Sequence, residues 1–142
     1  MLLDKSGTTV KLIDFGLAAF FKPGRKLTEV CGSKRFQAPE VYRKSSFPGS
    51  GGYEGPPVDV WSCGVVLFEL VHGQIRMSGA DAKITTGEFI EKNLKKHLKE
   101  KTFSPELVAL LRGTLQLEPK RRLSTQEILI HPWLKLNGCA EK

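Results

Sequence analysis

An acidic residue, Asp14, follows a short apolar and β-branched run, Thr9 to Ile13, and stands two positions before Gly16. A carboxylate at the mouth of a strand suits Mg²⁺, and the glycine frees the backbone to turn beside it. Mg²⁺ neutralises charge on phosphate oxygens in phosphoryl transfer, a reaction that asks a protein for positioning more than for covalent chemistry. Asp14 is therefore a candidate metal ligand. Taken alone, Asp14-Phe15-Gly16 also fits an ordinary turn.

Two further motifs make a chance occurrence of Asp14-Phe15-Gly16 a weaker explanation. Ala38-Pro39-Glu40 follows Asp14-Phe15-Gly16, and Asp59-Val60-Trp61-Ser62-Cys63-Gly64 stands further along the chain. Asp59 lies near the start of an otherwise apolar segment, where an unpaired carboxylate is costly. A tripeptide recurs by chance in many sequences, whereas all three motifs in one chain are much less expected by chance.

The elements that must position these residues can be read from turn residues and from periodicity. Met1 to Asp4 and Thr9 to Ile13 flank Lys5-Ser6-Gly7, a pattern that predicts two antiparallel strands joined by a turn and leading into Asp14. From Leu17 to Phe36 no helical period persists, and Pro23-Gly24 breaks the segment. We expect a long loop there.

The rest of the chain predicts helices in a single, mainly α bundle. Gly73 fits as the stop of a helix, Ser104-Pro105-Glu106 as a start, and Ser124-Thr125-Gln126-Glu127 as a capping box. The expected helices cover Pro39 to Arg43, Val58 to His72, a leucine-rich segment after Ser104, and a last segment from Ser124 to about His131-Pro132. An irregular loop, Lys44 to Pro57, separates the first two. The predicted fold class is thus mainly α with a small β-hairpin.

Composition leaves the class of partner open. Lys and Arg number 22 and Asp and Glu 15, which gives a net charge of +7 and admits a nucleic-acid partner. The charges are dispersed, however, and the densest run, Lys92 to Lys101, shares its helix with Ile90, Leu94 and Leu98 on one face. A solvated helix with an apolar stripe on the core is favoured over a membrane-surface helix. We expect neither nucleic acid nor a membrane span.

Three widely spaced cysteines, Cys31, Cys63 and Cys139, show neither metal-ligand spacing nor a disulfide framework. A reducing compartment fits such cysteine usage. We therefore expect an intracellular protein, cytoplasmic or nuclear.

The motif set resembles the C-terminal lobe of a eukaryotic-type serine/threonine protein kinase. Within that family, Pro57 to Gly64 and Gly32 to Gln37 resemble the calcium/calmodulin-dependent group, including the checkpoint kinases and the liver kinase B type. The resemblance assigns residues 1–135 to the kinase lobe, residues 14–40 to its activation segment and residues 136–142 to a tail. It implies a partial α+β kinase fold without the N-terminal lobe.

The resemblance also implies roles for individual residues in the reaction. Asp14 binds Mg²⁺ on the ATP phosphates, Phe15 packs inward, and Gly16 is the hinge beside them. Leu2 lies beneath the adenine, and Ser33 orients the acceptor hydroxyl and argues for serine/threonine specificity. The implied cofactors are ATP and Mg²⁺, and the implied partners are protein substrates that carry serine or threonine acceptors.

Other roles implied by the resemblance concern support and regulation. Arg122, within Leu117 to Ser124, forms an ion pair with Glu40, and Asp59 accepts hydrogen bonds from a catalytic loop. Glu69 is a candidate for meeting a substrate arginine, and Thr28 is a candidate phosphorylation site. A solvated glutamate and a plain loop hydroxyl remain the alternatives for Glu69 and Ser33.

The sequence departs from the family pattern in two ways. Lys34 and Phe36 stand where the family usually has proline and tyrosine, which alters peptide docking. The Gly-rich loop, the ATP-anchoring lysine and the H-R-D loop are not among the 142 residues. We therefore expect a truncated kinase domain without activity of its own. The alternative is a non-catalytic docking or regulatory module.

Overall fold

The protein is described by a computed structural model over residues 1–46, 51–76, 85–100 and 102–136. Its elements in chain order are β1 (Leu2–Leu3), β2 (Val10–Lys11), the 3₁₀ helix η1 (Lys34–Phe36), α1 (Pro39–Ser46), α2 (Gly55–His72), α3 (Thr86–Lys99), α4 (Pro105–Thr114), the 3₁₀ helix η3 (Pro119–Arg121), α5 (Thr125–Leu129) and α6 (Pro132–Leu136). The predicted fold class, mainly α with a small β-hairpin, is confirmed. Of the predicted tail, residues 136–142, positions 137–142 lie outside the described residues.

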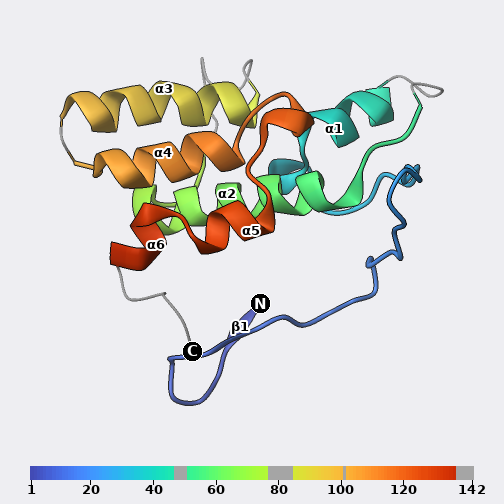
Figure 1. The fold of residues 1–142 in the computed structure, drawn as a ribbon, viewed down its shortest axis with the longest axis horizontal. Helices are drawn as coiled ribbons and strands as arrows, with labels where there is room; N and C mark the ends of the chain where they lie inside the picture. Colours follow the sequence, from blue (N-terminus) through green and yellow to red (C-terminus); the bar gives the residue numbers. More distant parts are fainter. Residues whose placement is uncertain (47–50, 77–84, 101, 137–142) are drawn as a thin grey trace.

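The helices form one body, and the chain before η1 runs along its outside (Figure 1). We call α1 to α6 the helical body and residues 1–33 the N-terminal arm. No residue of the N-terminal arm is buried. The core lies in the helical body and includes the fully buried side chains of Trp61, Val65 and Phe68 on α2. Only the body therefore has packing that can fix its own structure.

The central helix, α2, is apolar and contacts α4, η1 and η3. Its close approach to α4 depends on Gly64, because a Cβ atom at that position would lie 2.5 Å from Thr114 Oγ1. The helix starts at Gly55 rather than at the predicted Val58, since Pro56 and Pro57 fit a first turn whose N–H groups have no helical partner. It ends at the predicted Gly73, which has φ 99° and donates its N–H to Glu69 O.

Capping residues define the later helices as predicted. Ser104 Oγ accepts from Leu107 N–H at the start of α4. At the start of α5, Ser124 and Glu127 cap each other's backbone N–H groups in a capping box. The chain differs from the prediction after Leu129, because Pro132 opens a further short helix, α6, instead of following the last one.

The charge-rich helix α3 packs its apolar stripe on the core. Ile90 and Leu94 are each only 1% exposed, whereas Lys92, Lys95 and Lys96 are exposed. This arrangement confirms the solvated amphipathic helix favoured from the sequence. Among the described residues, no helix is both long and apolar enough to cross a membrane.

The hairpin at the start of the N-terminal arm is short but regular. Leu2 pairs with Lys11 and Leu3 with Val10. Asp4 organises the turn: Oδ1 accepts the N–H groups of Thr8 and Thr9, and the Ser6 hydroxyl also donates to the carboxylate. These hydrogen bonds, the one from Ser6 above all, hold the pKa of Asp4 below its usual value. The turn thus sets the direction in which β2 runs toward Asp14.

Candidate active site

Asp14 has a backbone conformation that side chains rarely adopt. Its φ is 62°, and among the described residues it is the only non-glycine with a positive φ. Its Oδ1 accepts the Gly16 N–H at 3.2 Å, whereas Oδ2 accepts no hydrogen bond within the described chain. Left-handed backbone at a non-glycine residue carries strain, and such strain clusters at functional sites. The exposed carboxylate is therefore a first candidate for chemistry.

A groove of about 1060 Å³ joins the N-terminal arm to the first turns of α2. Residues singled out from the sequence line it, namely Asp14, Phe15, Gly16, Thr28, Ser33 and Asp59. Leu2, Glu40, Glu69 and Arg122 lie outside its lining. The fold thus brings together residues up to 45 positions apart (59 − 14) from a loop and a helix.

The groove contains charges of both signs, from Asp14, Glu29, Asp59, Arg25 and Lys26. Asp59 is exposed overall, yet partial burial of its carboxyl raises its pKa, by desolvation alone. No described residue donates a hydrogen bond to this carboxyl. The free-energy cost of its partial desolvation is therefore not offset by a partner among the described residues. Asp59 thus has acceptor capacity free for a further group.

Ser33 stands at the start of η1, a turn that other side chains fix in place. Gln37 Nε2 donates to the carbonyl oxygens of Cys31 and Gly32, each at 3.0 Å. On the other side, Ser62 Oγ donates to Phe36 O at 2.9 Å and so ties the turn to α2. The Ser33 side chain itself makes no capping hydrogen bond. Its hydroxyl is exposed at the groove on a fixed backbone.

Gln37 and Ser62 were not singled out from the sequence. Their work is done by side-chain contacts to carbonyl groups, and such contacts follow from the tertiary fold rather than from local spacing. Ser62 Oγ also donates to Val58 O within its own helix. The contact with Phe36 O joins two separate elements, so the sequence alone did not indicate it.

The predicted ion pair between Glu40 and Arg122 is present. Arg122 Nη1 and Nη2 donate to Glu40 Oε1 and Oε2 at 2.6 and 2.7 Å, a bidentate contact across 82 positions of sequence. The Arg122 side chain is 1% exposed, and the Glu40 side chain 17%. Arg122 also donates to Gln116 O and Pro57 O and lies over the Trp61 ring. The body thus accepts hydrogen bonds from all three nitrogens of this buried cation.

Glu69, the candidate for meeting a substrate arginine, has an arginine of this chain as its partner. Arg35 Nη1 lies 3.4 Å from Glu69 Oε1, which also accepts the Ile75 N–H at 2.9 Å. Arg35 follows Ser33 by two residues and was not singled out from the sequence. The one hint of its role in the sequence is that Arg35 follows Lys34, which stands where the family pattern usually has proline.

Phe15 lies differently from what the resemblance implied. It does not pack inward: the residue is 69% exposed, because no described residue covers it. Leu2 lies exposed on β1 and does not line the groove. Thr28 is exposed at the groove, as a modification site requires.

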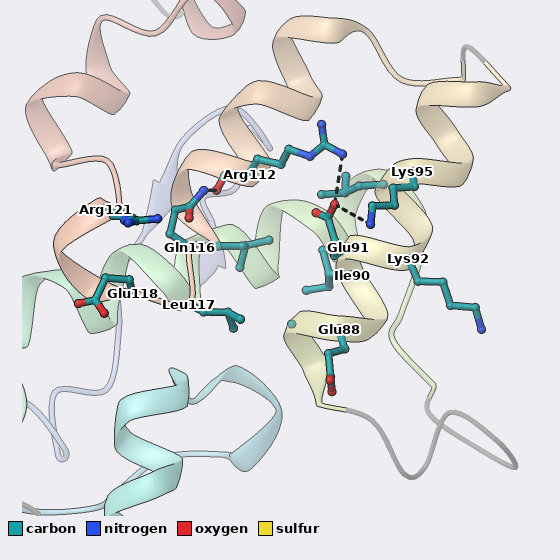
Figure 2. A pocket seen from close by; sticks show the side chains of 13 residues that line it. Glu88, Ile90, Glu91, Lys92, Lys95, Arg112, Gln116, Leu117, Glu118 and Arg121 are labelled. Atoms are coloured by element: carbon teal, nitrogen blue, oxygen red, sulfur yellow. Dashed lines mark hydrogen bonds and ion pairs between the residues drawn. The ribbon is translucent and has the colours of Figure 1, made fainter.

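A second groove, of about 850 Å³, lies between α3 and α4 and is drawn in Figure 2. Glu91 stands between Lys95 and Arg112, at 3.7 and 3.3 Å, so opposite charges pair across its wall. It contains none of the residues singled out as catalytic. Among the described residues, no cluster of three or more His, Cys, Asp or Glu side chains could hold a metal ion by itself.

Comparison with known proteins agrees with this arrangement. Residues 1–134 match the protein kinase domain family. The chain is 39% identical over 135 residues to the human SNF-related serine/threonine-protein kinase and 35% identical over 133 residues to calcium-dependent protein kinase 13 of Arabidopsis thaliana. It is 37% identical over 139 residues to sperm motility kinase 2B of Mus musculus.

These matches cover 95%, 92% and 94% of this chain but only 16%, 24% and 26% of the three relatives, respectively. The fold, the motifs and the family match define the class of protein. The chain belongs to the protein kinase family, and two of these relatives are named as serine/threonine or calcium-dependent protein kinases. It spans about a quarter or less of the length of these relatives.

Proposed function

We propose that this chain is the C-terminal lobe of a serine/threonine protein kinase, which transfers the γ-phosphate of ATP to hydroxyl groups of proteins. The observation that carries the proposal is the strained, exposed Asp14 carboxylate in one groove with Ser33. The family match and the named serine/threonine kinase relative support it. Residues 14–40 form the activation segment in this proposal, and residues 1–135 the lobe.

Asp14 fits the role of a Mg²⁺ ligand. Mg²⁺ in phosphoryl-transfer sites is held by one or two carboxylates, with water and substrate phosphates as its other ligands. Asp14 offers one exposed carboxylate, with Oδ2 free of hydrogen bonds to described residues. The Gly16 N–H fixes the orientation of Oδ1. When bound, Mg²⁺ would supply neutralisation of the charge on ATP phosphates.

The other groove residues would position the acceptor. Ser33 presents a hydroxyl, free of a capping bond, from a turn held by Gln37 and Ser62. Asp59 has the acceptor capacity for N–H groups of a catalytic loop.

The Glu40–Arg122 pair would hold the end of the activation segment on the body. Thr28 is the proposed phosphorylation site, and Leu2 is the proposed residue beneath the adenine.

We further propose that the 142 residues alone do not transfer phosphate. They contain neither an H-R-D sequence nor a G-x-G-x-x-G loop, the parts that supply the base and cover the phosphates in this family. The proposed cofactors are ATP and Mg²⁺, the partners are proteins with serine or threonine acceptors and no nucleic acid, and the location is intracellular. Similarity to a calcium-dependent kinase supports the calcium/calmodulin-dependent group.

The metal site can be tested without an activity assay. Mn²⁺ in place of Mg²⁺ broadens the NMR signals of amides near its site. With ATP present, we expect the amides of Phe15 and Gly16 to broaden first, and Asp14→Asn to abolish this effect. Asp4→Asn, a matched change at another carboxylate of the N-terminal arm, should retain it. Broadening centred away from Asp14, or unchanged in Asp14→Asn, would contradict the proposal.

A further inference from the structure

Two basic residues follow Ser33 directly, in the turn that borders the proposed acceptor site. Lys34 is exposed, and the Arg35 side chain is 35% exposed. The Arg35 guanidinium is held on one side by Glu69 Oε1 at 3.4 Å and lies 4.8 Å from the centre of the Phe36 ring. Because Ser62 ties Phe36 O to α2, the position of Arg35 is set by the body rather than by a free loop.

The Glu69 carboxylate already interacts with two groups of this chain. Its side chain is 15% exposed, and Oε1 receives both the Arg35 guanidinium and the Ile75 N–H. An arginine from a bound peptide would have to displace Arg35 and would approach Lys34 and Arg35, two like charges. Contact between like charges weakens the binding of a partner, and specific interfaces use such repulsion as well as attraction.

We propose that Arg35 is a specificity residue: it closes Glu69 to basic peptides and, together with Lys34, selects acceptor segments with Asp or Glu beside the hydroxyl. This inference rests on the proposed function, because it takes Ser33 to mark the acceptor site. The nearby groove adds Arg25 and Lys26 to the positive side and Glu29 to the negative side. Asp14 and Asp59, the remaining acids of the groove, are the groups assigned to Mg²⁺ and to backbone N–H donors.

Paired peptides test the inference on the 142-residue chain. Two fluorescent peptides share one serine and differ only in carrying Glu or Arg at the flanking positions, and anisotropy titration gives their dissociation constants. We expect the Glu peptide to bind about fivefold more tightly than the Arg peptide, the scale of one part-exposed ion pair. The ratio should fall toward one as salt screens the charges.

Variants separate Arg35 from net charge. Arg35→Glu should remove or reverse the preference, whereas Lys120→Glu, the same change of charge on exposed η3, should leave it intact. The double variant Arg35→Glu with Glu69→Arg keeps an opposite-charge pair between the two positions. It should lose the preference as well, so the test survives any folding defect of the single variant.

Three outcomes would overturn the inference: tighter binding of the Arg peptide by the parent chain, equal effects of Arg35→Glu and Lys120→Glu, or no saturable binding of either peptide. None of them bears on Asp14, which the Mn²⁺ experiment tests. Conversely, a failed Mn²⁺ experiment with an intact Arg35-dependent preference would reject Asp14 as the metal ligand and leave the acidic-peptide preference standing.

Discussion

The N-terminal arm and the helical body divide the work of this molecule. The arm carries Asp14 and Ser33 but buries no residue. The body buries Trp61, Phe68 and Leu111 and carries the Glu40–Arg122 pair. The arm is tied to the body by few contacts, among them the antiparallel bridge between Leu27 and Tyr53 and the hydrogen bond from the Tyr53 hydroxyl to Glu29 O.

Because burial is confined to the body, we expect substitutions to affect stability and chemistry separately. Changes in the body should alter the free energy of unfolding, because they remove buried contacts. Equivalent changes in the arm should leave it nearly unchanged. Arginine, phenylalanine and serine each occur in both regions, so the same substitution can be compared between the body and the arm.

The largest effect is expected for Arg122→Ala. It leaves the Glu40 carboxylate without its partner in a site where only 17% of that side chain is exposed, and it removes bonds to Gln116 O and Pro57 O. Breaking a buried pair costs about 3–5 kcal/mol. Urea unfolding should show this loss, with a smaller one for Glu40→Ala. Arg25→Ala in the arm should change the free energy of unfolding by less than about 0.5 kcal/mol. Equal values for Arg122→Ala and Arg25→Ala would remove the distinction.

A comparable loss is expected for Phe68→Ala. Phe68 is fully buried and stacks on His72 at 4.6 Å between ring centres. Truncating a buried phenylalanine costs about 3–5 kcal/mol. Phe20, by contrast, is fully exposed, so Phe20→Ala should leave the thermal midpoint within a degree or two of the parent, the shift expected for a few tenths of a kcal/mol. A large shift for Phe20→Ala would show that the arm is packed in solution.

A smaller effect is expected for Ser124→Ala, which removes one half of the capping box at α5. Loss of an N-cap hydroxyl costs about 1 kcal/mol. Ser6→Ala removes a hydroxyl that bonds only Asp4 and Thr8 in the arm, and it should cost less than Ser124→Ala. The order of the two denaturation midpoints checks this, and a reversed order would contradict it.

The smallest effect concerns pH and sits within the body. Burial, and next the neighbouring His72, lower the pKa of His97, which stacks on Phe103. A folded-state pKa below the unfolded value of about 6.5 means stability that is present above that pH and lost as pH falls through the folded pKa. Unfolding should therefore become easier between about pH 7 and pH 5. The slope should flatten in His97→Gln and persist in His131→Gln; a slope unchanged by His97→Gln would assign it to other groups.

Much of the fold could be predicted because its signals are local. The caps at Ser104 and Ser124 and the stop at Gly73 lie within a few residues of the helix ends they define. The Glu40–Arg122 pair, although 82 positions apart, was predicted through the resemblance rather than through spacing. The start of α2 at Gly55 differs from the predicted Val58, because Pro56 and Pro57 are as typical of a loop as of a first helical turn.

The candidate site was predicted only in part. The groups that fix the turn, Gln37 and Ser62, and the partner of Glu69, Arg35, act through contacts that depend on how η1 packs on α2. Such contacts have no signature in local sequence. The exposure of Phe15 likewise depends on which residues surround it, and the resemblance implied the opposite.

We propose that these 142 residues supply a scaffold and a carboxylate for Mg²⁺ but not the groups that cover ATP and activate the acceptor hydroxyl. Phosphate transfer from ATP to a serine peptide, measured with Mg²⁺ for the parent chain and for Asp14→Asn, tests it most directly. We expect no transfer by the parent chain above that of Asp14→Asn. Turnover by the parent at roughly 1–100 s⁻¹, the range of complete kinases, with its loss in Asp14→Asn, would contradict it.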